Sequence, residues 1–110
     1  MSEPRLPTQF WLMAEIKRCN AQSIPAYLVR RGDAERGTVL LRIDCFDQGY
    51  RLLVQARDAE GALGWLEVAS GLATAEAAAY VDRAVARDPD LWVVEVEDRE
   101  GRNPFAGRVL

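Results

Sequence analysis

Four apolar segments with a two-residue period, separated by short turns, occupy most of residues 26–68 and constrain the fold more than any other feature. The segments cover residues 26–31, 38–46, 50–57 and 62–68, and the turns between them contain glycine and aspartate. Alternate side chains of a strand share one face, and connections this short join antiparallel neighbours. The pattern therefore predicts three consecutive hairpins, a meander in which the strands follow one another in sequence order.

A helix is predicted on each side of this meander. Residues 9–22 carry apolar side chains at helical spacing behind Thr8, a residue type that caps helices. Residues 75–87 have one apolar stripe behind Thr74 and end at an Asp-Pro pair. The apolar run at 91–98 predicts a fifth strand. We therefore expect an α+β fold, a five-stranded and mainly antiparallel sheet with two helices, in the order α-β-β-β-β-α-β.

The length of 110 residues is that of a single domain, 1–110, which can form a core without disulfides or metals. Two prolines within residues 1–7 predict an irregular arm, and residues 103–110 are expected to form a loose tail. The stripe of the second helix is expected to pack against Trp92, Val94 and Val96, which share one face of the fifth strand.

Composition excludes several kinds of chemistry and partner. The chain has no histidine, so Ser/His/Asp and Cys/His catalysis and histidine zinc sites are excluded. Cys19 and Cys45 lie far apart in apolar patterns, which predicts buried thiols in a reducing compartment and no metal or other cofactor. The net charge of -3 predicts no attraction to nucleic acid. No membrane-length apolar stretch or secretion signal is evident, so we expect a cytoplasmic protein that contacts no membrane.

The acidic stretch EVED near the end of the fifth strand is the first candidate site. Glu95 and Glu97 share one strand face and stand about 7 Å apart, a separation at which carboxylates could hold a hard cation. The favoured interpretation is structural, since charge runs are usually solvated faces. If the first and fifth strands pair, Arg30 is the expected cross-strand partner of these acids.

The element order also resembles the core of the PD-(D/E)xK nucleases. Asp44 could supply the first acid of that motif, but the next strand offers Gln55 and Arg57 where an acid and a lysine are needed. A degenerate metal-dependent phosphodiesterase or nuclease-like domain using Asp44, Glu95 and Glu97 is therefore the alternative function, and no catalytic residue is assigned under the main one.

Three stretches, KRCNAQS, VRRGDAERGTVLLRI and RDPDLWVVEVEDREGR, resemble the domain of unknown function 1491 family, short single-domain proteins of alphaproteobacteria. The resemblance covers nearly the whole chain, and the last stretch is its most distinctive part. It implies a bacterial cytoplasmic setting, and it brings no activity and no catalytic residue to this chain.

The second face of the predicted sheet is too apolar to be solvated. Its leucines are Leu28, Leu40, Leu53 and Leu66, and its arginines include Arg42 and Arg57. If both helices pack on the other face, a second copy of the chain is expected to cover these leucines, with the two arginines at the rim. If the first helix crosses to this face, a monomer results. We therefore expect a non-enzymatic protein-interaction module that forms a homodimer and whose other protein partner is unknown.

Overall fold

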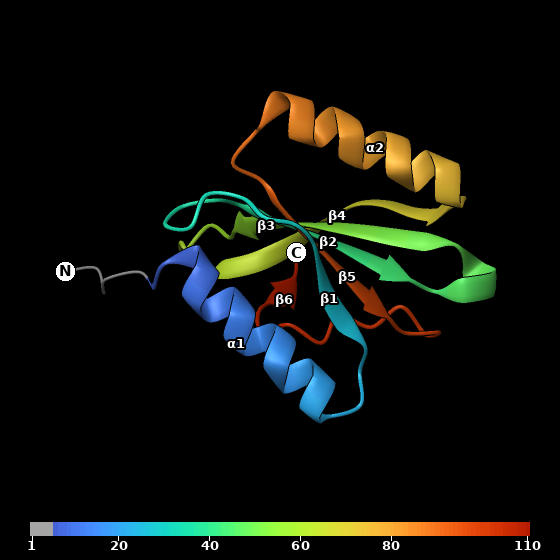
Figure 1. The fold of residues 1–110 in the computed structure, drawn as a ribbon, viewed down its shortest axis with the longest axis horizontal. Helices are drawn as coiled ribbons and strands as arrows, with labels where there is room; N and C mark the ends of the chain where they lie inside the picture. The colour runs from blue at the N-terminus through green and yellow to red at the C-terminus, as the bar shows by residue number, and fades with distance from the viewer. Residues whose placement is uncertain (1–5) are drawn as a thin grey trace.

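The computed structural model describes residues 6–110, which fold into two α-helices and one six-stranded sheet (Figure 1). The elements in chain order are α1 (Thr8–Ala21), β1 (Ala26–Arg30), β2 (Val39–Asp44), the 3-10 helix η1 (Phe46–Gln48), β3 (Tyr50–Arg57), β4 (Leu63–Leu72), α2 (Thr74–Arg87), β5 (Trp92–Glu97) and β6 (Arg108–Val109). The strand order across the sheet is β1-β5-β2-β3-β4-β6. The α+β class with two helices is thus confirmed.

The predicted five-stranded, mainly antiparallel sheet is wrong in two respects. β5 lies between β1 and β2, antiparallel to the first and parallel to the second, and β6 adds a sixth strand parallel to β4. The β2-β3-β4 meander is antiparallel as predicted, but β1 and β2 do not form a hairpin. A strand that is apolar on both faces is most stable at the centre of a sheet, and the first five residues of β5 are all buried.

The loop between β1 and β2 crosses the start of β5, and its two glycines make that crossing close. A Cβ atom on Gly32 would lie 2.1 Å from the Asp90 backbone oxygen, and one on Gly37 would lie 2.3 Å from the same atom. Either substitution would force the loop away from β5, because contacts this short are sterically forbidden. The glycines that suggest a hairpin turn therefore permit a close approach of backbone to backbone.

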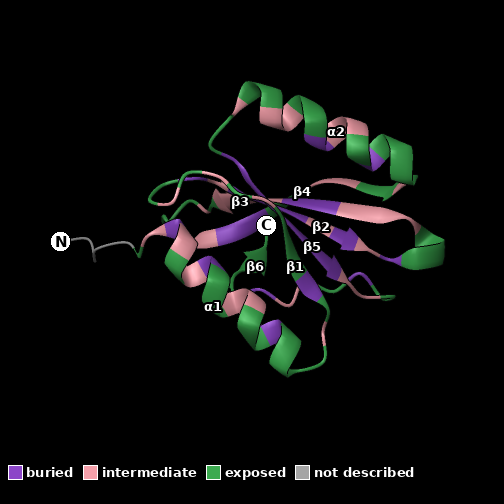
Figure 2. Ribbon diagram, viewed as in Figure 1, coloured by how far each residue is buried: buried purple, intermediate pink, exposed green. Residues whose placement is uncertain are grey.

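The two helices cover opposite faces of the sheet, so a buried sheet is enclosed between two helical layers whose outer sides are exposed (Figures 1 and 2). The larger core lies under α1 and the smaller one under α2. Trp92, Val94 and Val96 belong to the α1 core, so the expectation that they pack against α2 is wrong. Val93, on the other face of β5, packs with Val81 of α2. The alternation along β5 was predicted correctly, but strand alternation does not specify which helix covers which face.

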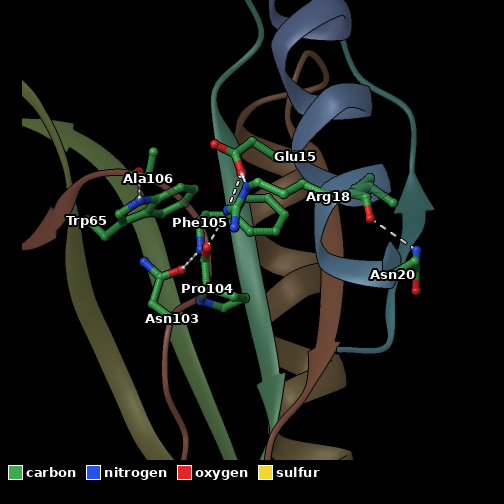
Figure 3. Close-up of polar contacts among 9 residues, drawn as sticks. Glu15, Arg18, Asn20, Trp65, Asn103, Pro104, Phe105 and Ala106 are labelled. Carbon is green, nitrogen blue, oxygen red and sulfur yellow. Dashed lines mark hydrogen bonds and ion pairs between the residues drawn. The ribbon is translucent and has the colours of Figure 1, made fainter. Parts of the chain in front are cut away.

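The C-terminal residues 103–110, expected to form a loose tail, contain one buried aromatic side chain, while residues 106–110 are exposed. Phe105 is 3% exposed and packs edge-on against Trp65, with ring centroids 6.0 Å apart. The Trp65 Nε1–H group donates to the Ala106 carbonyl oxygen at 2.9 Å, and Arg18 of α1 donates to the Pro104 carbonyl oxygen (Figure 3). Burial of one aromatic ring thus ties this segment across the α1 side of the sheet.

The predicted arm at residues 1–7 falls mostly outside the described residues, and Leu6 and Pro7 belong to neither a helix nor a strand. Within residues 6–110, neither helix has the length and apolar character needed to cross a bilayer.

Candidate functional site

The three predicted acids lie on the face of the sheet that carries α2. Asp44 and Glu97 are register partners at the carboxyl ends of the parallel strands β2 and β5, and Glu95 pairs with Arg42 two residues earlier. The pairing of β1 with β5, on which the cross-strand prediction depended, is present. The fold therefore brings the predicted acids to one end of one face, as the strand parity of Glu95 and Glu97 required.

Glu95 is buried, at 5% exposed, so the prediction of a solvated carboxylate is wrong for this residue. Arg42 Nε donates to Glu95 Oε1 at 2.6 Å from β2, and the Tyr27 hydroxyl donates to Oε2 from β1. The Arg42 guanidinium also lies over the Tyr50 ring, 5.8 Å from its centroid. The carboxylate is thus enclosed by one cation and one hydroxyl from the two neighbouring strands, as a buried charge requires.

Arg30, the expected partner of these acids, is engaged elsewhere. Its Nη1 atom donates to the Leu91 carbonyl oxygen at 2.7 Å and to the Pro89 carbonyl oxygen at 2.9 Å. The pairing of β1 with β5 shifts register between Leu28 and Arg30, which moves the arginine opposite Val93. The type of interaction was predicted correctly, but the partner was not, because Arg42 becomes a neighbour of Glu95 only when β5 inserts beside β2.

Two tyrosines near Glu95 have raised pKa values. The hydrogen bond to Glu95, followed by burial, raises the pKa of Tyr27 to about 12. Burial is also the largest cause that raises the pKa of Tyr50. Both phenols therefore stay protonated near neutral pH. Tyr27 remains a hydrogen-bond donor to Glu95 because it does not ionise in this pH range.

Three of the six carboxylate oxygens of the predicted acids accept hydrogen bonds within residues 6–110. Both Glu95 oxygens accept hydrogen bonds, and Asp44 Oδ1 accepts the Phe46 backbone N–H at 2.9 Å. Across residues 6–110, no group of three His, Cys, Asp or Glu side chains is arranged to hold a metal ion. The sequence-based nuclease motif also required groups on β3, but the Gln55 side chain accepts from the Val39 backbone and Arg57 donates to the Gly61 carbonyl oxygen.

The leucines predicted to form one interface do not share a face. Leu40 and Leu53 are both fully buried, but Leu40 packs in the α2 core and Leu53 in the α1 core. Leu28, 37% exposed, lies on the edge strand β1, and Leu66, 48% exposed, lies on β4. The predicted patch is therefore two covered residues and two separate exposed ones.

The reason is the register between β2 and β3. Leu41, not Leu40, stands opposite Leu53, and a shift of one residue moves a side chain to the other face. The predicted rim residues are separated in the same way: Arg42 lies beside Glu95 on the α2 face, and Arg57 stands opposite Leu63 at the far end of the β3-β4 pair. The sequence also allowed the first helix to cross to the face opposite the second helix. The helices do lie on opposite faces of the sheet in this way.

Exposed apolar side chains gather instead on the outer side of α1 and on β1. Of the ten large apolar residues that are exposed within residues 6–110, five lie there, and we call them the α1–β1 surface: Phe10, Met13, Tyr27, Leu28 and Val29. Phe10 is 71% exposed. The sequence carried a signal for this surface, because residues 10–13, FWLM, place apolar side chains on all sides of α1, and one helix face alone can pack on the sheet.

β1 is an edge strand whose backbone is partly covered by a side chain. The Asn20 amide donates to the Ala26 carbonyl oxygen at 2.9 Å, and its Oδ1 accepts the Ala26 N–H at 3.2 Å. Glu97 N donates to the Pro25 carbonyl oxygen, so by the alternation of an antiparallel ladder the backbone groups of Ala26 and Leu28 point away from β5. Asn20 thus binds the outward-pointing backbone groups of Ala26. The outward-pointing backbone groups of Leu28 remain available to another strand.

Comparison with known proteins gives one consistent result. A family model described as protein of unknown function (DUF1491) matches residues 6–106. The crystal structure of a DUF1491 family protein from Caulobacter crescentus CB15 has a TM-score of 0.84 and 35% identity, covering 96% of this chain and 100% of that one. The NMR structure of a DUF1491 family protein from the same organism has a TM-score of 0.83 and 34% identity, covering 98% and 99%.

A third solved structure, the solution structure of protein Atu0922 from A. tumefaciens, has a TM-score of 0.73 and 25% identity. It covers 86% of this chain and 87% of that one. No curated protein matches the chain. The similar structures therefore extend over almost the whole fold, and the names that they carry state no activity.

Proposed function

The chain belongs to the DUF1491 family of proteins of unknown function, and we propose that it is a non-enzymatic protein-interaction module that self-associates in the bacterial cytoplasm. The observation that carries this proposal is the concentration of exposed apolar side chains on the α1–β1 surface. Five exposed apolar side chains on one helix and the adjacent edge strand are more than singly scattered surface residues, and such a concentration is typical of a protein-contact site. Two buried, unpaired cysteines, Cys19 and Cys45, support a reducing compartment.

The partner that fits the α1–β1 surface is a second copy of the chain. A short turn joins α1 to β1, and the strand runs back along the helix, so that Asn20 lies by Ala26 and Gln9 by Arg31. A two-fold axis beside the middle of β1 brings the β1 strands of two copies together. The outward-pointing backbone groups of Leu28 in one copy then face those of Leu28 in the other. The contact then buries the same apolar residues on both copies, as an isologous dimer requires.

Charges around this surface complement one another under the same two-fold axis. Arg31 and Glu35 follow the carboxyl end of β1, Glu97 lies at the β5 end that pairs with the start of β1, and Lys17 lies four residues before the end of α1, the helix that leads into β1. None of these four residues forms an ion pair with any other residue of 6–110. An antiparallel arrangement brings Arg31 of one copy toward the Glu97 end of the other, and Lys17 toward Glu35.

Light scattering behind a sizing column tests the proposal. We expect the parent chain to elute with a dimer mass at about 100 µM, a concentration that populates complexes of micromolar affinity. Leu28→Glu should give a monomer, because it places a charge at the centre of the contact. Leu66→Glu is the matched control, an exposed leucine on β4, and should remain dimeric. A monomeric parent, or a dimer that survives Leu28→Glu, contradicts the proposal.

The alternative function, a degenerate metal-dependent phosphodiesterase, has one specific observation in its favour. Asp44 and Glu97 stand opposite each other at the carboxyl ends of two parallel strands, a common position for ligand sites. Calorimetric titration with Mg²⁺ and Mn²⁺ distinguishes the two functions. Stoichiometric Mn²⁺ binding that is lost in Glu97→Gln would favour the enzyme, whereas the interaction module predicts no such binding.

A further inference from the structure

A cavity of about 700 Å³ opens where the amino end of α1, the β1–β2 loop and the far end of the β3-β4 pair meet. Leu6, Thr8 and Trp11 line it from the helix side. The loop contributes residues 35–38, and the strands contribute residues 55–57 and Leu63. Its volume falls within the range of about 300 to 1,000 Å³ that is typical of small-molecule sites.

Hydrogen bonds hold the walls of this cavity in place, and the one from Thr8 is buried. The Thr8 hydroxyl donates to the Gly37 carbonyl oxygen at 2.9 Å, and the Gln9 backbone N–H donates to the Ala34 carbonyl oxygen at 2.9 Å. Behind the loop, Trp92 Nε1 donates to the Asp33 carbonyl oxygen at 2.7 Å. The loop is therefore fixed to both the helix and the sheet, so the cavity is preformed.

Two polar side chains of the cavity have donor groups that meet no other described residue. Trp65 and Trp92 each donate their indole N–H to a carbonyl oxygen, whereas the Trp11 indole N–H donates to none within residues 6–110. Gln55 uses its oxygen to accept the Val39 backbone N–H, and its NH₂ group donates to no described residue. These groups can donate to a ligand without losing a bond inside the protein.

The charged lining favours an anion. Arg36 and Arg57 supply two guanidinium groups, and Glu35 is the one acid among the lining residues. Arg36 forms no ion pair within the described part of the chain, and Arg57 donates to a neutral carbonyl oxygen, that of Gly61. Guanidinium groups match carboxylates in geometry as well as charge.

We propose that this cavity binds a small carboxylate that carries an aromatic or branched aliphatic group. The carboxylate is recognised by Arg36 and Arg57, and the apolar group packs against Leu6, Trp11 and Leu63. This ligand site goes beyond the proposed self-association. None of the five residues of the α1–β1 surface lines the cavity, so the two can be tested separately.

Titration of the ¹⁵N-labelled protein with 2-naphthoate, followed by two-dimensional NMR, tests the proposal. The three tryptophans give three indole N–H signals, and Trp11→Phe identifies the one from the cavity. We expect that signal to shift on saturation, while those of Trp65 and Trp92, whose indoles are already hydrogen-bonded, stay in place. The cationic analogue 2-naphthylmethylamine should leave all three unshifted. Equal effects of the two probes, or no shift of the Trp11 signal, would overturn the proposal.

Charge-reducing variants test the assigned residues. In Arg36→Gln/Arg57→Gln the dissociation constant for 2-naphthoate should rise by about tenfold or more, the effect of losing a charge-assisted hydrogen bond. Arg83→Gln/Arg87→Gln, on α2, is the matched control and should bind as the parent does. Unchanged affinity in the cavity variant overturns the assignment. Repeating the titration on Leu28→Glu separates the result from any failure of self-association, because that variant keeps the whole cavity.

Discussion

Replacing Arg42 with methionine removes the cation that faces the Glu95 carboxylate and leaves an apolar side chain of similar length in its place. The Arg42 side chain is 19% exposed and that of Glu95 is 7% exposed, so solvent cannot replace the lost partner fully. Breaking a buried ion pair from one side destabilises a protein by about 3–5 kcal/mol. Because Arg42 retains some exposure, we expect about 3 kcal/mol, equivalent to about 12 °C in Tm for a chain of this length.

Urea denaturation followed by tryptophan fluorescence measures this effect, since Trp65 and Trp92 are fully buried. The double variant Arg42→Met/Glu95→Met removes both charges and should recover to within about 1 kcal/mol of the parent. Glu67→Gln is the control, because Glu67 pairs with Arg51 in a more exposed position. It should change the free energy of unfolding by less than about 1 kcal/mol.

A loss of less than about 1 kcal/mol in Arg42→Met would show that the Arg42–Glu95 pair contributes no more than an exposed ion pair does. A double variant that loses as much stability as the two single variants together would also contradict the pairing of the two charges. That result would show that Arg42 and Glu95 contribute independently, and not as a pair.

Two further predictions concern the edges of the sheet. The folded pKa of Tyr27, raised to about 12, lies above the ordinary tyrosine value of about 10, so the contribution of Tyr27 to stability is complete below pH 10 and is lost as the pH rises toward 12. Ultraviolet absorbance titration should show this late step in the parent, no such step in Tyr27→Phe and an earlier one in Glu95→Gln. The same late step in Tyr27→Phe would contradict the hydrogen bond. Phe105→Ala should lower the free energy of unfolding by about 3 kcal/mol and expose Trp65, and unchanged fluorescence and stability would show that the C-terminal segment does not pack as described.

The meander of β2, β3 and β4 was predictable because its strands are neighbours both in sequence and in space. The position of β5 was not, because a local pattern cannot show that the loop over residues 32–37 crosses another strand. The sequence did carry one indication of this position. The stretch LWVVEV is apolar on both faces up to Glu95, which is typical of a central strand and not of an edge.

The candidate site illustrates the same limit. Strand parity predicted that Glu95 and Glu97 share a face, and they do, since they pair with Arg42 and Asp44 on β2. The burial of Glu95 depends on Tyr27 and Arg42, which come from strands on either side of β5, so it follows only from the sheet order. Likewise, Leu53 pairs with Leu41 and not with Leu40 across β2 and β3. Because of this difference of one residue, Leu40 and Leu53 lie in different cores.

Self-association through the α1–β1 surface is tested most directly by NMR spectra of the backbone amides recorded over a dilution series. If the proposal is right, the amide signals that change between about 10 µM and 1 mM, a range that spans micromolar affinities, will cluster at residues 10–13 and 27–31. Signals from α2 and from the exposed part of β4 around Leu66 will stay constant. Spectra that do not change with concentration, or changes centred on α2 or β4, would contradict self-association through the α1–β1 surface.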